Sequence, residues 1–259
     1  MSQLGLEAAR QKMLDAGVAT PAVDVFSHYY RLVESGETGL IREEDIEPLT
    51  DPPMLDDVEV SDNEAREAIG ATVIIKLNGG LGTSMGLDKA KNLLEVRDGL
   101  NFLDLIVQQV QAARRDWDAP LPLLFMNSFR TEADTLAHLS RYPDLPVDGL
   151  PLSFLQNQEP KLRADDLTPV EWPADPGLEW CPPGHGDIYT SLWSSNLLQQ
   201  LIDKGFRYAC TANGDNLGAA PNARLAGWFA ASGAPYAAEL CRRTINDRKG
   251  GHLAVRKRD

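Results

Sequence analysis

The residues best suited to chemistry lie in the glycine-rich stretch LNGGLGTSMGLDKAK, residues 77–91. Its glycines allow tight turns in which successive backbone N–H groups point into one concavity and bind an anion. Lys89 and Lys91 add positive charge. The stretch is not a P-loop, and it is not the dinucleotide fingerprint, because Met85 stands where the third glycine would be. The alternative is a surface loop with two solvated lysines. Because the glycine-rich stretch directly follows an apolar run, phosphate binding is the favoured interpretation.

A second candidate is PPGHGDIY, residues 182–189, in which Gly184 and Gly186 flank His185. The two glycines would let the imidazole and the backbone approach a ligand closely. The alternative is an ordinary turn in which Asp187 is the N-cap of the next helix. The spacing alone leaves both interpretations open.

A third candidate is ANGDNLG, residues 212–218, which follows another apolar run. Asp215 could hold Mg²⁺ between its carboxylate and substrate phosphates, as hard cations are usually bound in phosphoryl chemistry. An Asn/Asp/Gly turn is the alternative, since these residues favour turns in any case. A nearby phosphate loop makes the metal interpretation competitive.

A fourth candidate is NDRKGGH, residues 246–252, where Lys249 precedes two glycines. It could contact a phosphate or a sugar, although a charged turn between two strands fits the composition better. The sequence contains no G-x-S-x-G, so it does not predict a hydrolase nucleophile elbow.

The composition limits the possible classes of protein. The 259 residues are 43% hydrophobic, enough for one large domain, and the net charge is −13. This acidity argues against non-specific binding to nucleic acid or to an anionic membrane. Three widely spaced cysteines predict neither a disulfide framework nor a zinc site and indicate a reducing, cytoplasmic location. The sequence shows no membrane span and no signal peptide. It leaves an oligomer possible.

The elements that must position these residues alternate between strand and helix. Helices are expected within 1–50 and at 101–110, 131–141, 188–204 and 222–232. Strands are expected at 71–77, 121–127, 152–156, 206–212 and 234–242, with a further strand starting at 251. This order predicts an α/β fold with a mainly parallel or mixed, Rossmann-like sheet flanked by helices. Ligands bind beyond the carboxyl ends of such strands, which selects the segments after 77, 156 and 212.

We expect a helical N-terminal extension and linker at 1–62, followed by one domain at 63–259. Because a strand has only just begun where the chain ends, we also expect that the C-terminal part of the domain is missing.

Five motifs in this order resemble the UTP–glucose-1-phosphate uridylyltransferase (UDP-glucose pyrophosphorylase) family. They are KLNGGLGTSMG (76–86) with Lys91, EVRDGLNFLDLIV (95–107), GHGD (184–187), DNLGA (215–219) and DRKGG (247–251). The resemblance covers about residues 70–255 and implies a glycosyltransferase-A-like nucleotidyltransferase domain. Eukaryotic relatives carry a Cys–Gly–Pro type of sequence near 87–90, so LDKA at that place suggests a bacterial variant.

The resemblance also implies roles for individual residues. The residues implied in substrate binding are Gly79, Gly80, Leu81, Gly82, Thr83, Gln158, Gly184, His185 and Asn216. The residues implied in catalysis are Lys91, Asp215 and Lys249. Lys91 would contact the triphosphate, Asp215 would hold the Mg²⁺, and Lys249 would bind the phosphate or sugar end. Gln158 would read the uracil edge, with Gln156 as its competitor.

The resemblance implies a cytoplasmic enzyme that uses UTP, glucose 1-phosphate and the cofactor Mg²⁺. The sugar phosphate would attack the α-phosphorus of UTP in line, and pyrophosphate would leave. A UDP-sugar or UDP-N-acetylglucosamine pyrophosphorylase is one alternative, and a non-catalytic UTP-binding fragment is another.

Overall fold

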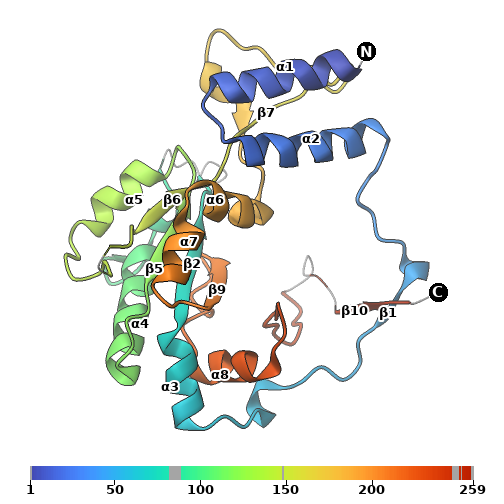
Figure 1. Cartoon of the computed structure of the whole chain (residues 1–259). Helices are drawn as coiled ribbons and strands as arrows, with labels where there is room; N and C mark the ends of the chain where they lie inside the picture. The colour runs from blue at the N-terminus through green and yellow to red at the C-terminus, as the bar shows by residue number, and fades with distance from the viewer. Residues whose placement is uncertain (1, 82–88, 148, 247–250, 252, 258–259) are drawn as a thin grey trace.

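The computed structural model describes residues 2–81, 89–147, 149–246, 251 and 253–257 (Figure 1). Its centre is a parallel sheet of four strands in the order β6-β5-β2-β9. These strands are β2 (Thr72–Asn78), β5 (Leu123–Asn127), β6 (Ser153–Leu155) and β9 (Tyr208–Asn213). The chain adds strands on one side of β2 and then returns to its other side. The point where this direction reverses is where ligands bind in open α/β sheets.

Strand β2 is the axis of the sheet and is buried on both faces. Its residues alternate between two apolar cores, with Ile74 in one and Val73 and Ile75 in the other. A nearly continuous β-branched run is what such a position requires, because both faces of the strand are covered. The expected strand at 71–77 is therefore confirmed.

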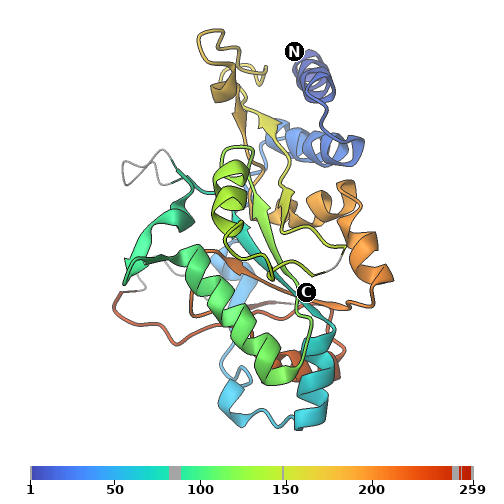
Figure 2. The same cartoon turned by 90° about the vertical axis from the view of Figure 1, so that its left-hand side faces the viewer.

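Helices cover both faces of the sheet (Figure 1, Figure 2). One core contains side chains of α3 (Asp62–Gly70), α4 (Phe102–Trp117), α5 (Glu132–Leu139) and α8 (Ala223–Ser232). The core on the opposite face contains side chains of α6 (Ile188–Ser194) and α7 (Leu197–Asp203). This arrangement confirms the α/β class expected from the alternation of elements.

Local signals fix the start of α4. Asn101 and Asp104 form a capping box, in which each side chain accepts a hydrogen bond from the other's backbone N–H, both at 3.0 Å. Before it, β3 (Glu95–Arg97) and β4 (Leu100–Asn101) form a hairpin. Asp98 and Gly99 make its turn with φ values of 55° and 74°, as a two-residue hairpin turn requires.

Helices α1 (Ser2–Asp15) and α2 (Thr20–Glu34) pack against the segment between β6 and α6. That segment contains β7 (Glu159–Pro160), the short helix η5 (Pro176–Glu179) and β8 (Trp180–Cys181). Lys12 forms an ion pair with Glu179 and donates to the Val170 carbonyl at 2.8 Å. Tyr30 donates to the Leu167 carbonyl at 3.0 Å. The N-terminal helices therefore have their own small core.

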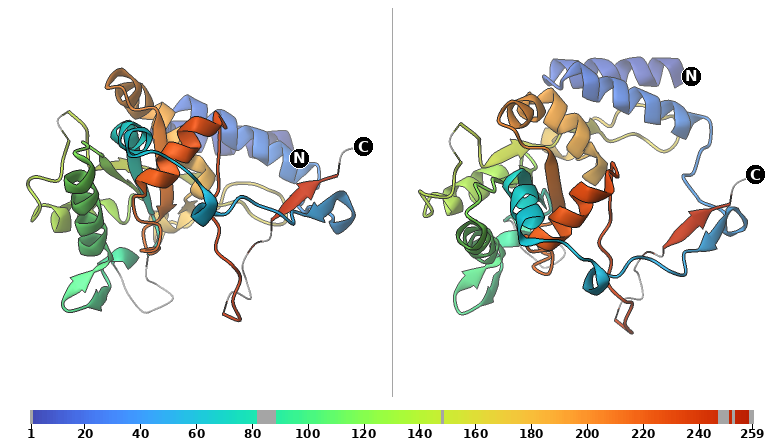
Figure 3. Two further views of the ribbon diagram at one scale, coloured as in Figure 1. Left: turned by 90° about the horizontal axis from the view of Figure 1, so that it is seen from below. Right: turned by 60° about the horizontal axis from the view of Figure 1, so that its bottom comes forward.

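Three expectations about elements are wrong. Within 1–50, η1 (Glu43–Asp45) is followed by a strand, β1 (Ile46–Pro48), which pairs antiparallel with β10 (Ala254–Arg256) (Figure 3). The expected helix at 188–204 is broken at Asn196, whose φ of 59° is left-handed. The expected strand at 234–242 is irregular and pairs with no strand that the structure describes; Tyr236 is 70% exposed. Without a partner, the β-propensity of that segment stabilises nothing.

Between β1 and α3 lies the short helix η2 (Leu55–Asp57) in an otherwise irregular connector, as the proline-rich sequence predicts. Within the described residues, no helix combines the length and the apolar character needed to cross a bilayer.

Candidate active site

The structure brings together two of the residues expected to act in catalysis. Lys91 begins the short helix η4 (Lys91–Leu93), and Asp215 lies two residues beyond the end of β9. The Lys91 Nζ and an Asp215 carboxylate oxygen are 2.5 Å apart. Their side chains are 41% and 33% exposed, so the ion pair is open to solvent and accessible to a ligand. It lies at the carboxyl edge of the sheet, beside the point where strand order reverses.

The glycine-rich loop is closed at its base by backbone contacts. The Lys91 N–H donates to the Gly80 carbonyl at 3.1 Å, and Leu81 forms an isolated bridge with Ala90. These contacts place Lys91 directly at the mouth of the loop. Gly82 and Thr83 lie outside the described residues, and so does Lys249.

Gln156 lies against the base of the same loop. It directly follows β6, and its N–H donates to the Asn127 carbonyl at 2.8 Å. A Cβ on Gly79 would collide with the Gln156 Nε2, so any other residue at this position would displace the Gln156 amide. The Gly79 carbonyl also accepts a hydrogen bond from Ser128 at 3.0 Å. Gln156 is 8% exposed, and its amide makes no hydrogen bond with another described residue.

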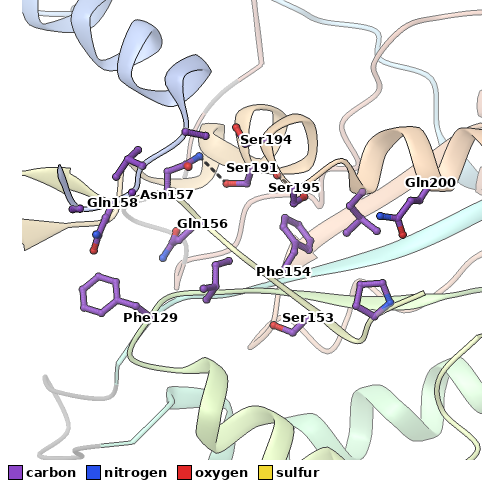
Figure 4. Close-up of a pocket in the computed structure, with 17 residues that line it drawn as sticks. Phe129, Ser153, Phe154, Gln156, Asn157, Gln158, Ser191, Ser194, Ser195 and Gln200 are labelled. Carbon is purple, nitrogen blue, oxygen red and sulfur yellow. Dashed lines mark hydrogen bonds between the residues drawn. The ribbon is translucent and has the colours of Figure 1, made fainter. Parts of the chain in front are cut away.

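Gln158, the residue first expected to read the base, lies two residues beyond Gln156. Gln156 and Gln158 both line a cavity of about 480 Å³, in which Gln158 lies at the same end as Phe129 and Gln200 lies at the other end (Figure 4). The cavity lies along β6 between α6, α7 and the turn joining α1 to α2, and its described lining is uncharged. Both glutamines therefore border this cavity, and Gln156, the competitor, also packs against Gly79 of the glycine-rich loop.

The GHGD segment forms a turn that is hydrogen-bonded to Asn157, the residue after Gln156. Gly184 has a φ of 107°, which disfavours any other residue, and it leads into the short helix η6 (His185–Asp187). Asp187 is buried and accepts hydrogen bonds from the Asn157 N–H at 2.6 Å and from the Ser191 hydroxyl at 2.6 Å. Asp187 is also the N-cap residue of α6, as that alternative expected, although its side chain makes no capping hydrogen bond. His185 is exposed.

A second carboxylate lies near Asp187. Glu159 in β7 is half-buried, and burial, followed by the charge of Asp187, raises its pKa from 4.5 to about 7. The group therefore changes charge near neutral pH, directly behind the segment that carries Gln156.

Two residues that sequence reasoning missed donate hydrogen bonds to the backbone of the loop that contains Asp215. Lys76, within β2, is 1% exposed and donates to the Ala219 carbonyl at 2.7 Å. Gln109 in α4 donates to the Leu217 carbonyl at 2.9 Å. Burial lowers the pKa of Lys76. The signal that could have found Lys76 is a lysine inside an otherwise apolar strand. Asn216 is exposed in this loop.

The donor set suits a metal ion that arrives with phosphates. In the part of the chain that the structure describes, no group of three or more His, Cys, Asp or Glu residues could hold a metal. Asp215 offers one accessible carboxylate. Mg²⁺ keeps several waters and is often bound by one or two carboxylates plus substrate phosphates, so a single aspartate fits such a shared site.

Comparisons with known proteins identify the family of the chain. The profile of the family described as UTP–glucose-1-phosphate uridylyltransferase matches residues 23–259. A protein of that name from Solanum tuberosum is 40% identical over 191 residues, which are 73% of this chain and 40% of the relative. Another from Saccharomyces cerevisiae is 42% identical over 181 residues, 70% of this chain and 36% of the relative.

Solved structures give the same result. The L281D mutant of UDP-glucose pyrophosphorylase from Leishmania major, in complex with UDP-glucose, matches with a TM-score of 0.91 and 42% identity, over 98% of this chain and 53% of that one. The chain thus spans about half the length, or less, of these relatives. They are eukaryotic, so they do not support the expected bacterial variant. The match confirms the glycosyltransferase-A-like nucleotidyltransferase fold, and the chain belongs to the UTP–glucose-1-phosphate uridylyltransferase family.

Proposed function

We propose that this chain binds UTP and carries the nucleotide half of a site that transfers a uridylyl group to glucose 1-phosphate. The observation that carries the proposal is the Lys91–Asp215 pair at the mouth of the glycine-rich loop. A phosphate-binding cation and a metal-binding carboxylate side by side suit a magnesium nucleotide. Family membership supplies the substrate class, since the relatives are named for UTP and glucose 1-phosphate.

In the proposed reaction a phosphate oxygen of glucose 1-phosphate attacks the α-phosphorus of UTP. The new P–O bond forms in line with the α–β bridging oxygen, and the electrons of the broken bond leave with pyrophosphate. The nucleophile is already ionised, so no general base is needed. Lys91 orients the triphosphate and neutralises part of its charge, and Asp215 would hold the metal ion. When bound, Mg²⁺ supplies further charge neutralisation on the phosphates.

For base recognition, the geometry supports Gln156 over Gln158. A glutamine amide offers an NH2 donor group and a carbonyl acceptor, which together can pair with the edge of a uracil ring. Gln156 presents such an amide against Gly79, at the loop that would hold the nucleotide. Gly184 and His185 stand on the neighbouring turn, which Asp187 joins to Asn157. We propose Lys249, Gly82 and Thr83 as further contacts on the family resemblance alone.

The cytoplasm is the proposed location, because Cys181, Cys210 and Cys241 are all free thiols, as expected in a reducing compartment.

The test is ligand binding followed by turnover. A ligand that binds only the folded state raises the melting temperature, by an amount that grows with ligand concentration above Kd. We expect UTP with Mg²⁺ to raise it more than CTP or ATP with Mg²⁺ at equal concentration. No shift with any nucleotide would refute the proposal.

Turnover then distinguishes the remaining candidates. Pyrophosphate release is measured with UTP and glucose 1-phosphate, galactose 1-phosphate or N-acetylglucosamine 1-phosphate in parallel. Release with glucose 1-phosphate supports the proposed transfer, and preference for another sugar phosphate favours the UDP-sugar or UDP-N-acetylglucosamine enzymes. Binding without release favours a non-catalytic UTP-binding fragment. That candidate is kept because the chain spans only 36–40% of the potato and yeast relatives.

A further inference from the structure

Asn92, in the middle of η4, is buried although both ends of its short helix are partly exposed. Asn92 is 3% exposed, and its side-chain amide donates to the side-chain carbonyl of Asn78 at 2.5 Å. Asn78 is the last residue of β2. The amide therefore ties the turn that carries Lys91 to the end of the central strand.

The same amide lies directly beneath the residue that precedes Asp215. A Cβ on Gly214 would collide with the Asn92 amide nitrogen, and it would lie 3.2 Å from the Leu77 carbonyl oxygen. The Gly214 N–H donates to that carbonyl at 2.9 Å. Asn92 thus contacts the base of the loop that carries Asp215 as well as the strand behind Lys91.

From Asn78, side-chain hydrogen bonds continue across the sheet. Asn78 donates to Asn127 at 2.6 Å and to Thr135 at 2.8 Å, and Asn127 donates to Ser153 at 2.9 Å. Polar side chains linked across three strands have few alternative arrangements, because a broken bond would leave a buried polar group unpaired. Asn92 is the end of this network that reaches the site.

We propose that Asn92 is a positioning residue that sets the Lys91 ammonium against the Asp215 carboxylate. A three-residue helix has little rigidity of its own, and a solvent-exposed ion pair is weak. The Asn92 side chain lies between Asn78 and Gly214 and fixes the backbone of both segments that carry the charges. It therefore supplies the rigidity that the short helix and the ion pair lack. The catalytic meaning of this geometry rests on the proposed function, whereas the geometry itself can be tested without it.

The first test measures whether Lys91 is paired. The folded chain is treated briefly with an amine-acetylating reagent, and peptide mass spectrometry gives the rate for Lys91 relative to Lys204, an exposed lysine. Freeing the ammonium should speed labelling. We expect about a fivefold increase in Asn92→Ala, the scale of losing one modest pairing interaction. Ser153→Ala, at the far end of the network, is the matched control and should leave the rate unchanged.

The second test is a double-mutant cycle between Asn92 and Gly214. Gly214 does not have a left-handed φ, so Gly214→Ala is disfavoured by collision alone. We expect it to lower the melting temperature by several degrees in the wild-type chain and by clearly less in Asn92→Ala, where the colliding amide is gone. Contact with the Leu77 carbonyl should leave a residual cost in both backgrounds.

Unchanged Lys91 labelling in Asn92→Ala, or additive effects in the cycle, would overturn the proposal. UTP with Mg²⁺ is added in a parallel labelling series and should protect Lys91 in the wild-type chain and protect it less in Asn92→Ala. If UTP neither protects Lys91 nor raises the melting temperature of the wild type, the proposed function fails. The labelling rates without nucleotide still decide whether Asn92 positions Lys91.

Discussion

Glu159 should make the folded protein less stable as the pH rises through neutrality. In the folded chain its pKa is about 7, against 4.5 for the free side chain, chiefly because it is buried and secondly because Asp187 is near. The folded state therefore holds the proton more tightly than the unfolded state. It follows that the free energy of unfolding falls between about pH 4.5 and pH 7 and then levels off.

The magnitude follows from the two pKa values. At about 1.4 kcal/mol for each pH unit between them, the full effect would be about 3.4 kcal/mol. Glu159 keeps some contact with solvent, and screening reduces the expected effect to about 1–2 kcal/mol. Glu159→Gln, which is neutral and of the same shape, should raise the melting temperature by about 3–6 °C at pH 8 and by no more than about 1 °C at pH 5.

The assay is thermal unfolding of both proteins at pH 5, 6, 7 and 8 in constant salt. Glu67→Gln, on the exposed face of α3, is the control for removing one negative charge from an acidic chain and should not reproduce the effect. A difference between Glu159→Gln and the wild type that is equal at pH 5 and pH 8 would refute the reasoning. So would a wild-type chain whose stability increases from pH 5 to pH 8 by more than it does in the variant.

Three further predictions concern the site and the core. In a catalytically active form, Lys91→Ala should lower turnover by well over an order of magnitude, because losing one preorganised charge contact costs about 3 kcal/mol. Lys89→Ala is the control and should not lower turnover, and steady-state kinetics measure both. Gly79→Ala should weaken UTP binding about tenfold, because its Cβ displaces Gln156; Gly70→Ala, which meets open space, is the calorimetric control. Asp104→Ala should destabilise the fold by about 2–4 kcal/mol in urea titration. Burial raises the pKa of Asp104, but its hydrogen bonds outweigh this and lower it, so the loss should be largest above pH 4 and fade in acid.

Features of the fold that depend on neighbouring residues could be predicted from the sequence. Asn101 caps α4 because its partner, Asp104, is three residues away, and the Asp98-Gly99 turn is equally local. The break at Asn196 was not predictable, because nothing in the helical pattern of 188–204 requires a left-handed residue there. The pairing of β1 with β10 joins distant segments, and neither is apolar enough to predict a partner.

The candidate site divides in the same way. Sequence motifs identified Lys91 and Asp215, and parallel strand order explains why residues so far apart meet. The proposed choice of Gln156 over Gln158 could not be made from the sequence, since both are amides near the end of β6 and line the same cavity, and only Gln156 packs against Gly79. No sequence motif singles out Asn92, because its proposed role comes from its contacts with Asn78 and Gly214, which are distant in the sequence.

The ribbon made by β1 and β10 has a consequence for how the molecule opens. Three residue pairs, nearly all exposed, join segments separated by roughly 200 residues of chain. Closing so long a loop costs much entropy, and few buried contacts repay it, so this contact forms only after the intervening chain has folded. Its amide protons should therefore exchange with solvent through local separation of the two strands, long before the four-stranded sheet is disturbed.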